Sequence, residues 1–140
     1  MNSISDKAVV SSKAKIGKNF SIGHFSIVED DVEIGDNVSI ASSAIIHNGA
    51  RISSRVRIYH SAVLSCEPQD LKFSGESTIL EVGENSVIRE FVTLARGTNA
   101  RGKSVIGKNC YIMAYAHIAH DSLIGNNVIL SNAVNMGGHV

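Results

Sequence analysis

Aliphatic side chains recur at every sixth position of this 140-residue chain. The series begins at Ile4 and runs unbroken to Leu64, and the same phase resumes at Val82 and at Ile106 and continues to Met136. A period of six fits neither the turn of an α-helix nor the simple alternation of a strand. It is typical of short strands joined by regular turns, as in hexapeptide-repeat β-helices. The pattern therefore predicts an all-β solenoid built from six-residue units.

A second pattern marks the corners of this solenoid. The string aliphatic-Gly-any-Asn occurs at five places, namely 16–19, 34–37, 82–85, 106–109 and 124–127. Gly and Asn tolerate the left-handed backbone conformation that a tight corner requires. The first two strings, and likewise the last two, begin 18 residues apart. Three six-residue units therefore form one coil, and we expect a triangular cross-section.

Two interruptions of the period predict loops that leave the solenoid. The aliphatic phase fails at Asp70 and Glu76, and again at Ala100, which leaves 20 of 23 units, or between six and seven coils. We expect a longer loop within 65–81 and a shorter one within 97–104, both leaving from the same corner. Loops held by a rigid scaffold are a common place for function.

Composition narrows the class of protein. Thirteen Lys and Arg balance 13 Asp and Glu, which argues against nucleic acid or an anionic membrane as the main partner. An apolar content of 44% excludes intrinsic disorder. The sequence has no membrane-spanning run and no signal-peptide pattern, and Cys66 and Cys110 form neither a disulfide framework nor a metal knuckle. We expect a single cytosolic domain over 1–140.

The period also brings distant residues together, because residues one coil apart lie above one another at about one strand spacing. Gly138 is then directly above His120, and His139 is above Asp121. His117 lies three residues before His120. We expect these five residues to converge near the corner from which both loops leave.

The chemistry of this cluster favours acid–base catalysis. Imidazole titrates near neutrality, and a neighbouring carboxylate favours its protonated form, so His120 and Asp121 are suited to act as a general base and its support. Gly138 has no side chain, and its N–H could approach a developing oxyanion. The remaining histidines are interpreted as ordinary solvated residues, and these are His24, His47 and His60.

Several segments resemble one family in sequence, order and spacing. They are Gln69-Asp70-Leu71-Lys72-Phe73-Ser74-Gly75-Glu76, Ile88-Arg89-Glu90, Arg96-Gly97-Thr98, Met113 through Asp121, and Gly137-Gly138-His139-Val140. Throughout its length the chain resembles acyl-carrier-protein-dependent UDP-N-acetylglucosamine 3-O-acyltransferases of lipid A biosynthesis. The resemblance implies a left-handed parallel β-helix, although the general rule for crossover connections favours the right hand.

The resemblance also implies a role for each residue at this corner. His120 would take the proton of the sugar 3-hydroxyl as it attacks the acyl thioester, Asp121 would orient His120, and Gly138 would supply the oxyanion N–H. Six further residues would contact the substrates, and these are Gln69, Asp70, Lys72, Met113, His117 and His139. No metal or other cofactor is implied, because the acyl group arrives as a thioester on acyl carrier protein.

Partners follow from the same resemblance. The family works as a homotrimer with active sites between neighbouring subunits, so partner chains would complete the site. The segment 91–110 carries four cations and no acid, and its basic face could receive an acidic carrier protein or simply be solvated. Family members continue through further coils and a helical C-terminal part, so we expect this chain to be the N-terminal part of such an enzyme.

Two other interpretations remain open. Without the family's C-terminal half, the chain could be a scaffold that binds ligand or trimerises without turnover. A zinc enzyme similar to the trimeric β-helix carbonic anhydrases could use His117, His120 and His139 as ligands. The spacing of the first two and the match of the flanking loop favour the acyltransferase.

Overall fold

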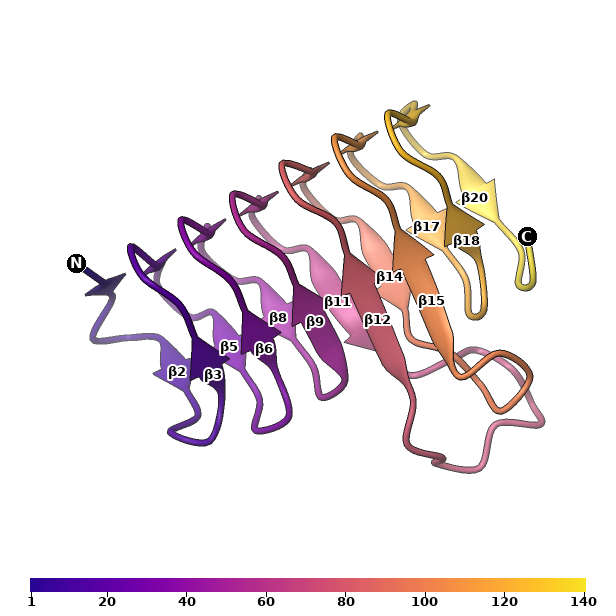
Figure 1. Cartoon of the computed structure of the whole chain (residues 1–140), viewed down its shortest axis with the longest axis horizontal. Helices are drawn as coiled ribbons and strands as arrows, with labels where there is room; N and C mark the ends of the chain where they lie inside the picture. The colour runs from indigo at the N-terminus through magenta and orange to yellow at the C-terminus, as the bar shows by residue number, and fades with distance from the viewer.

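The computed structural model describes all 140 residues as a left-handed parallel β-helix, as the six-residue period and the resemblance predict. Twenty short strands follow one another along the chain, and each coil gives one strand to each of three parallel sheets. The two termini lie at opposite ends of the long axis (Figure 1). No helix of the structure has the length and apolar character needed to cross a membrane.

The three sheets form the faces of a triangular prism. Sheet A contains β1 (Ser3–Ile4), β4 (Ser21–Ile22), β7 (Ser39–Ile40), β10 (Arg57–Ile58), β13 (Val87–Ile88), β16 (Tyr111–Ile112) and β19 (Ile129–Leu130). Sheet B contains β2 (Val9–Val10), β5 (Ile27–Val28), β8 (Ile45–Ile46), β11 (Val63–Cys66), β14 (Thr93–Ala95), β17 (His117–Ile118) and β20 (Asn135–Met136). Sheet C contains β3 (Lys15–Ile16), β6 (Glu33–Ile34), β9 (Ala50–Ile52), β12 (Ile79–Val82), β15 (Lys103–Ile106) and β18 (Leu123–Ile124).

The aliphatic residue of each unit points into the prism and stacks on its equivalent in the next coil. Ile46 of β8 pairs in register with Leu64 of β11, and both side chains are fully buried. The same arrangement continues through the molecule and joins 26 buried residues into one core. Each buried aliphatic side chain contributes about 1.5–3 kcal/mol of transfer free energy. The sequence period is therefore the period of the core.

The corner between sheets C and A uses the residues that the corner strings predict. The asparagines of all five strings have left-handed backbones with φ between 55° and 62°. Arg55 stands at the equivalent position of another coil with φ of 60°, and its guanidinium bonds Asn85 and Glu84. The prediction of regular corners is confirmed.

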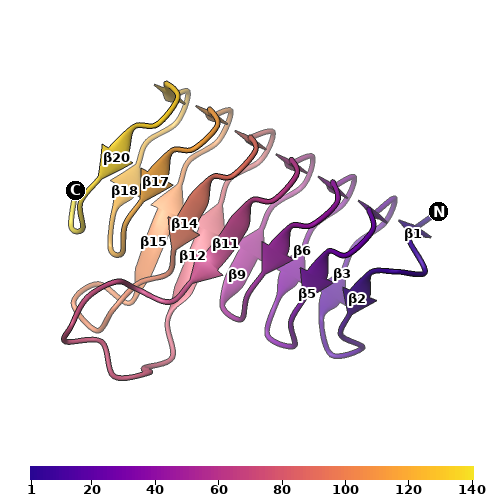
Figure 2. The same ribbon diagram turned by 180° about the vertical axis from the view of Figure 1, so that it is seen from behind.

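Two loops interrupt the coils at the corner between sheets B and C. Residues 67–78 connect β11 to β12, and residues 96–102 connect β14 to β15. Both project from the same edge of the prism, near its C-terminal end (Figures 1 and 2). The Gly97 N–H donates to the Ile79 carbonyl at 3.2 Å, and the Thr78 hydroxyl donates to the Gly97 carbonyl. The base of the longer loop is therefore fixed to the start of the shorter one.

Candidate active site

The backbone of Gly138 lies against the imidazole of His120 at the corner between sheets B and C. Strand β17 pairs with β20 so that His117 faces Asn135, which places positions 120 and 138 above one another. A Cβ at position 138 would lie 2.7 Å from His120 Nε2 and overlap the ring. Glycine is therefore the residue that permits this contact.

Asp121 is the centre of a buried hydrogen-bond network. Its carboxylate accepts a hydrogen bond from His120 Nδ1 at 3.0 Å, from the N–H and hydroxyl of Thr98, and from the Arg101 N–H. Its own N–H donates to Ser104 Oγ, and its carbonyl accepts from the Arg101 guanidinium. These bonds hold a left-handed backbone with φ of 59°. The shorter loop is thereby tied to the side chain beside His120.

The hydrogen bonds also set the charge of this carboxyl group. Burial by itself would raise the pKa of Asp121, but the bonds from Thr98, His120 and Arg101 together bring the pKa below its ordinary value of 3.8. An ionised carboxylate only accepts hydrogen bonds, so Nδ1 of His120 carries the proton in this pair. The lone pair of Nε2 then faces away from Asp121, towards the loops.

The longer loop brings a second carboxylate to the free side of the imidazole. Asp70 Oδ2 lies 3.9 Å from His120 Nε2. The ring of His139 stands edge-on to that of His120, with 4.8 Å between centroids. Asp70, Lys72 and His139 share the lining of a cavity of about 270 Å³ with residues of both loops. A polar ligand in this cavity would lie beside the imidazole.

Three predicted site residues belong neither to the lining of this cavity nor to the cluster of His120, Asp121 and Gly138. Gln69 is exposed on the longer loop. His117 is on the outer face of β17, where its Nδ1 bonds Thr93 Oγ1 at 2.6 Å, and burial together with the nearby His120 lowers its pKa below 6.5. Met113 follows β16 at the corner between sheets A and B, at the other end of β17. These three assignments rest on the resemblance.

Comparison with known proteins gives the family. The sequence profile described as bacterial transferase hexapeptide (six repeats) matches residues 13–48 and 103–138, which is more than half of the chain. The chain belongs to this family. The hexapeptide repeats of its members correspond to the six-residue units of the sequence.

Comparison with individual proteins shows which members of the family the chain is similar to in sequence and structure. Over 141 aligned residues the chain is 50% identical to the acyl-[acyl-carrier-protein]–UDP-N-acetylglucosamine O-acyltransferase of Pseudomonas putida, and 40% identical to that of Thermodesulfovibrio yellowstonii. Each alignment covers 100% of this chain and 55% of the relative. The crystal structure of the UDP-N-acetylglucosamine acyltransferase of Bacteroides fragilis superposes with a TM-score of 0.95 at 44% identity, over 96% of this chain and 53% of that one. The resemblance is confirmed, and the chain spans about half the length of these relatives.

Sequence reasoning missed the residues that hold this hexapeptide transferase site in place. Thr98 and Ser104 are buried polar residues whose hydrogen bonds end on Asp121. The Arg96 guanidinium lies 5.1 Å from the ring centroid of Phe73, beneath the longer loop. Thr98, Arg96 and Phe73 belong to the segments that carried the resemblance, but no role followed for them because loop contacts have no period.

Three of the four cations of the segment 91–110 lie together at the shorter loop. Arg96 and Arg101 are in the loop, and Lys103 is the first residue of β15, while Lys108 lies at the corner between sheets C and A. Lys103 Nζ lies 3.1 Å from Glu81 Oε1, and the Arg101 guanidinium donates to the Asp121 carbonyl. Contact of this segment with a carrier protein stays a prediction.

Within one chain, the possible zinc ligands that come together differ from the three histidines that the sequence suggested. The side chains whose ligand atoms come together are Asp70, His120 and His139, all within 4.8 Å of one another. His117 is not in this group, and its Nδ1 bonds Thr93. The three-histidine set is therefore not formed within one chain.

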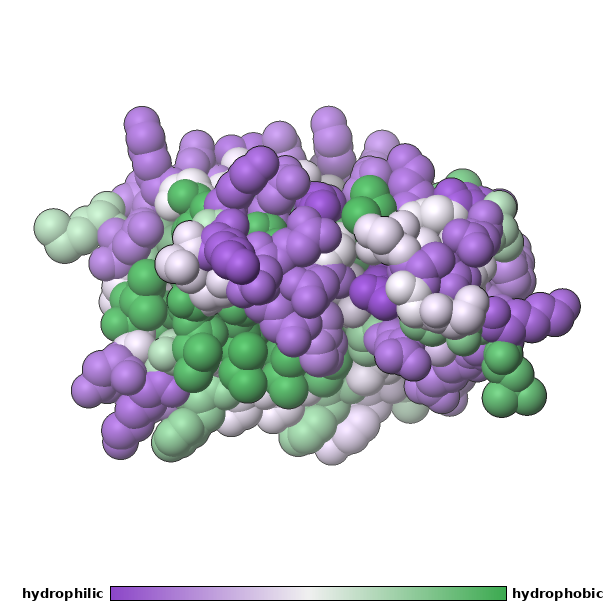
Figure 3. Space-filling view, turned by 90° about the horizontal axis from the view of Figure 1, so that it is seen from below, coloured by the Kyte–Doolittle hydropathy of each residue, from purple (hydrophilic) through white to green (hydrophobic).

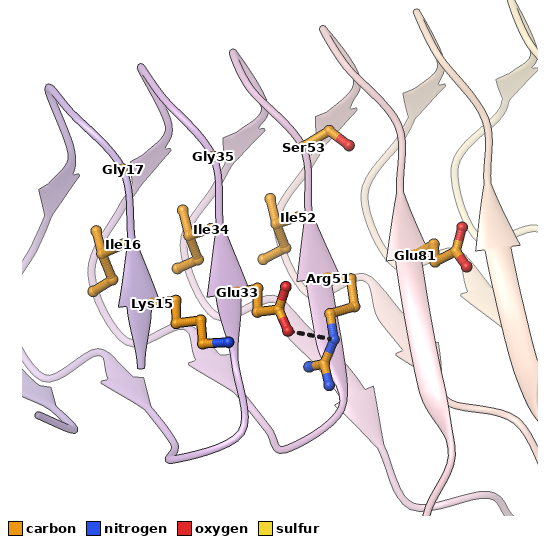
Figure 4. A pocket seen from close by; sticks show the side chains of 10 residues that line it. All are labelled: Lys15, Ile16, Gly17, Glu33, Ile34, Gly35, Arg51, Ile52, Ser53 and Glu81. Carbon is orange, nitrogen blue, oxygen red and sulfur yellow. Dashed lines mark ion pairs between the residues drawn. The ribbon is translucent and has the colours of Figure 1, made fainter. Parts of the chain in front are cut away.

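A wider hollow on sheet C has a structural explanation. It has a volume of about 640 Å³ and lies over β3, β6 and β9, where Lys15, Glu33, Arg51 and Glu81 alternate in charge along the outer face (Figure 4). Arg51 forms ion pairs with Glu33 at 3.3 Å and with Asp31 at 2.8 Å. Opposite charges on adjacent strands stabilise a sheet modestly. The alternating ion pairs therefore account for the polar residues that line the hollow.

Sheet B carries an outward row of aliphatic side chains, of which Val9 and Ile27 are exposed and Ile45 and Val63 half-buried. Val9, Ile27, Ile45 and Val63 stand in register on the outer faces of four successive strands. Figure 3 shows apolar surface gathered over the N-terminal part of the molecule. Along the same sheet, the row continues as Thr93 and then His117, beside the site. Large exposed apolar surfaces commonly mark interaction sites.

Proposed function

We propose that this chain carries the active site of an acyltransferase, in which His120 is the general base. The reaction would transfer a (3-hydroxy)acyl group from acyl carrier protein to the 3-hydroxyl of UDP-N-acetylglucosamine, the first step of lipid A synthesis. The observation that carries the proposal is the orientation of His120, whose Nδ1 bonds the buried Asp121 carboxylate while Nε2 lies 3.9 Å from Asp70 Oδ2. Relatives of about twice this length bear the corresponding name.

The proposed reaction follows from these atoms. The sugar hydroxyl donates its proton to His120 Nε2 while its oxygen attacks the thioester carbonyl, forming a C–O bond. Asp121 stabilises the resulting imidazolium through Nδ1–H. The tetrahedral intermediate then collapses, the C–S bond breaks, and the departing carrier thiolate takes the proton from His120. No redox partner is needed.

Gly138 provides the group that stabilises the intermediate in this proposal. Its N–H donates no backbone hydrogen bond in the structure, and its Cα faces the imidazole. A backbone donor in such a place is worth about 2.7–4 kcal/mol of transition-state stabilisation in other acyl transfers. Substrate contacts are assigned in the same proposal to Gln69, Asp70, Lys72, Met113, His117 and His139.

The direct test is acyl transfer by the intact chain. We expect the parent chain to transfer a hydroxyacyl group from its carrier protein to UDP-N-acetylglucosamine, and His120→Ala to lose about 10²–10⁴-fold in rate, the usual contribution of a general base. His60→Ala is the control, because His60 is exposed at another corner and bonds Ser42. A folded parent without transfer would support the scaffold interpretation and overturn the proposal.

A homotrimer is part of the proposed function. The outward row on sheet B is the apolar surface available to a second copy, and it ends beside His117. We expect the parent to sediment as a trimer and Ile27→Glu to sediment as a monomer. Ile129→Glu, on the outer face of sheet A, is the control and keeps the trimer. A parent chain that sediments as a monomer would contradict the proposed trimer.

We also place the protein in the cytoplasm, where free cysteines are stable and the carrier protein is made.

A further inference from the structure

We propose that Asp70, His120 and His139 form a binding site for a divalent transition metal, with Zn²⁺ as its preferred ion. One ligand atom from each side chain lies within 4.8 Å of the other two. The three residues come from the longer loop, from the corner after β17 and from the turn after β20. Two histidines and one carboxylate are a ligand set that binds transition metals in many proteins.

The partners of His120 prepare this residue for coordination. A metal-binding imidazole usually donates its other N–H to a carboxylate, which fixes the ring and strengthens the ligand. Asp121 supplies that carboxylate at 3.0 Å from Nδ1, and Thr98 in turn holds Asp121. His120 therefore holds Nε2 in a fixed direction, 3.9 Å from Asp70 Oδ2, and its side chain is only 11% exposed.

Asp70 places a carboxylate oxygen near the free nitrogen of His120. Asp70 Oδ1 accepts the Lys72 N–H at 3.0 Å, while Oδ2 lies 3.9 Å from His120 Nε2. Both atoms can serve as metal ligands. A metal ion between them accepts electron pairs from both.

Metal binding requires the three ligand atoms to move closer to one another. Tetrahedral zinc with bonds of about 2.0–2.2 Å holds its ligand atoms about 3.3 Å apart. Asp70 is on a loop, and the side chain of His139 is 52% exposed, so both can approach the fixed His120. The fourth position would be left to water on the open side of the cavity.

An occupied site would inhibit the proposed reaction. The metal uses the same Nε2 lone pair that takes the proton of the sugar hydroxyl, so metal and catalysis exclude one another. This consequence rests on the proposed function, whereas metal binding itself does not.

The binding test needs no activity. Metal-free chain is titrated with Zn²⁺ by calorimetry and with Co²⁺ by visible absorption, which reports tetrahedral nitrogen and oxygen ligands. We expect one ion per chain, and a rise in the dissociation constant of about tenfold or more in Asp70→Asn and in His139→Gln. His47→Gln is the matched control, because His47 also pairs with a carboxylate, that of Glu29, at 3.0 Å. We expect this variant to bind Zn²⁺ with the affinity of the parent chain.

The outcomes of these experiments test metal binding, inhibition and the proposed function separately. Absence of binding, or equal dissociation constants in the parent and in both variants, overturns the site. Zn²⁺ that binds but leaves acyl transfer unchanged overturns the inhibition, whereas inhibition at the binding constant that a chelator reverses supports it. A chain without any transfer contradicts the proposed function alone, and the titrations still decide the metal site. Circular dichroism of each variant shows that a lost site is not a lost fold.

Discussion

Gly138 and His120 are 18 residues apart in sequence and in contact in space, with the glycine backbone lying on the imidazole ring. Because the coil length fixes this contact, the position of the ring depends on the absence of a side chain one coil above it. The Gly138 N–H donates no backbone hydrogen bond. One residue thus both confines the proposed base and offers the donor for the oxyanion.

The first prediction follows from this contact. Gly138→Ala places a Cβ inside the space of the His120 ring, so the imidazole must move away. A displacement of about 1 Å at a reacting group can reduce the rate by about 100-fold, and we expect a loss of this size in kcat. Gly137→Ala is the control, because a Cβ at 137 meets no atom within 4 Å. Equal kcat values for the two variants would contradict the account.

A second prediction concerns the stability of the fold in acid. The pKa of Asp121 is below 3.8 in the folded chain, so its ionised form contributes stability at higher pH, and this contribution is lost as pH falls through the folded pKa. We expect Asp121→Asn to lower the free energy of unfolding near neutrality. The difference from the parent should shrink as pH falls below about 3.8. Urea unfolding of the parent and the variant at several pH values measures this difference in free energy. A difference that does not change with pH would contradict the ionised state assigned to Asp121.

The longer loop provides a third prediction. A cation–π contact such as that between Arg96 and Phe73 is worth about 0.5–2 kcal/mol, equivalent to a two- to thirtyfold change in the population of an open loop. We expect Arg96→Ala and Phe73→Leu to increase tryptic cleavage after the exposed Lys72 by such a factor, and Phe73→Tyr to retain the parent rate. Phe25→Leu, an exposed aromatic at another corner, is the control. Unchanged cleavage in Phe73→Leu would show that the contact does not hold the loop.

The core gives a fourth prediction. Ile46 is fully buried between neighbouring coils, and its truncation to Ala leaves a cavity that a rigid stack fills poorly. We expect a loss of about 2–5 kcal/mol in the free energy of unfolding. Ile129→Ala, at a side chain that is 70% exposed, should change stability by less than about 0.5 kcal/mol. Similar losses in both variants would contradict the assignment of inward and outward rows.

The regular part of the molecule could be predicted from sequence because its structure and its sequence have the same period. The aliphatic phase from Ile4 onwards identifies the inward row, and the asparagine strings identify one corner. Together they fix 18 residues per coil, so the contact between His120 and Gly138 follows by counting. The hand of the coil came from the resemblance, since periodicity alone is the same for both hands.

The loops could not be predicted in this way. Counting locates where 67–78 and 96–102 leave the coil, but no period determines how they fold back. The approach of Asp70 to His120, and the bonds from Thr98 to Asp121, depend on loop conformation. The same holds for the cations of the segment 91–110, because Arg96 and Arg101 lie in the shorter loop and Lys103 follows it, while Lys108 lies one corner further on.

The most direct measurement of the central claim is the position of the bound sugar. A crystal structure of the chain with UDP-N-acetylglucosamine should place the 3-hydroxyl oxygen within about 3.2 Å of His120 Nε2, the reach of a general base. The same structure should show Asp121 still bonded to Nδ1. A sugar bound away from this corner, or with another hydroxyl facing Nε2, would contradict the account.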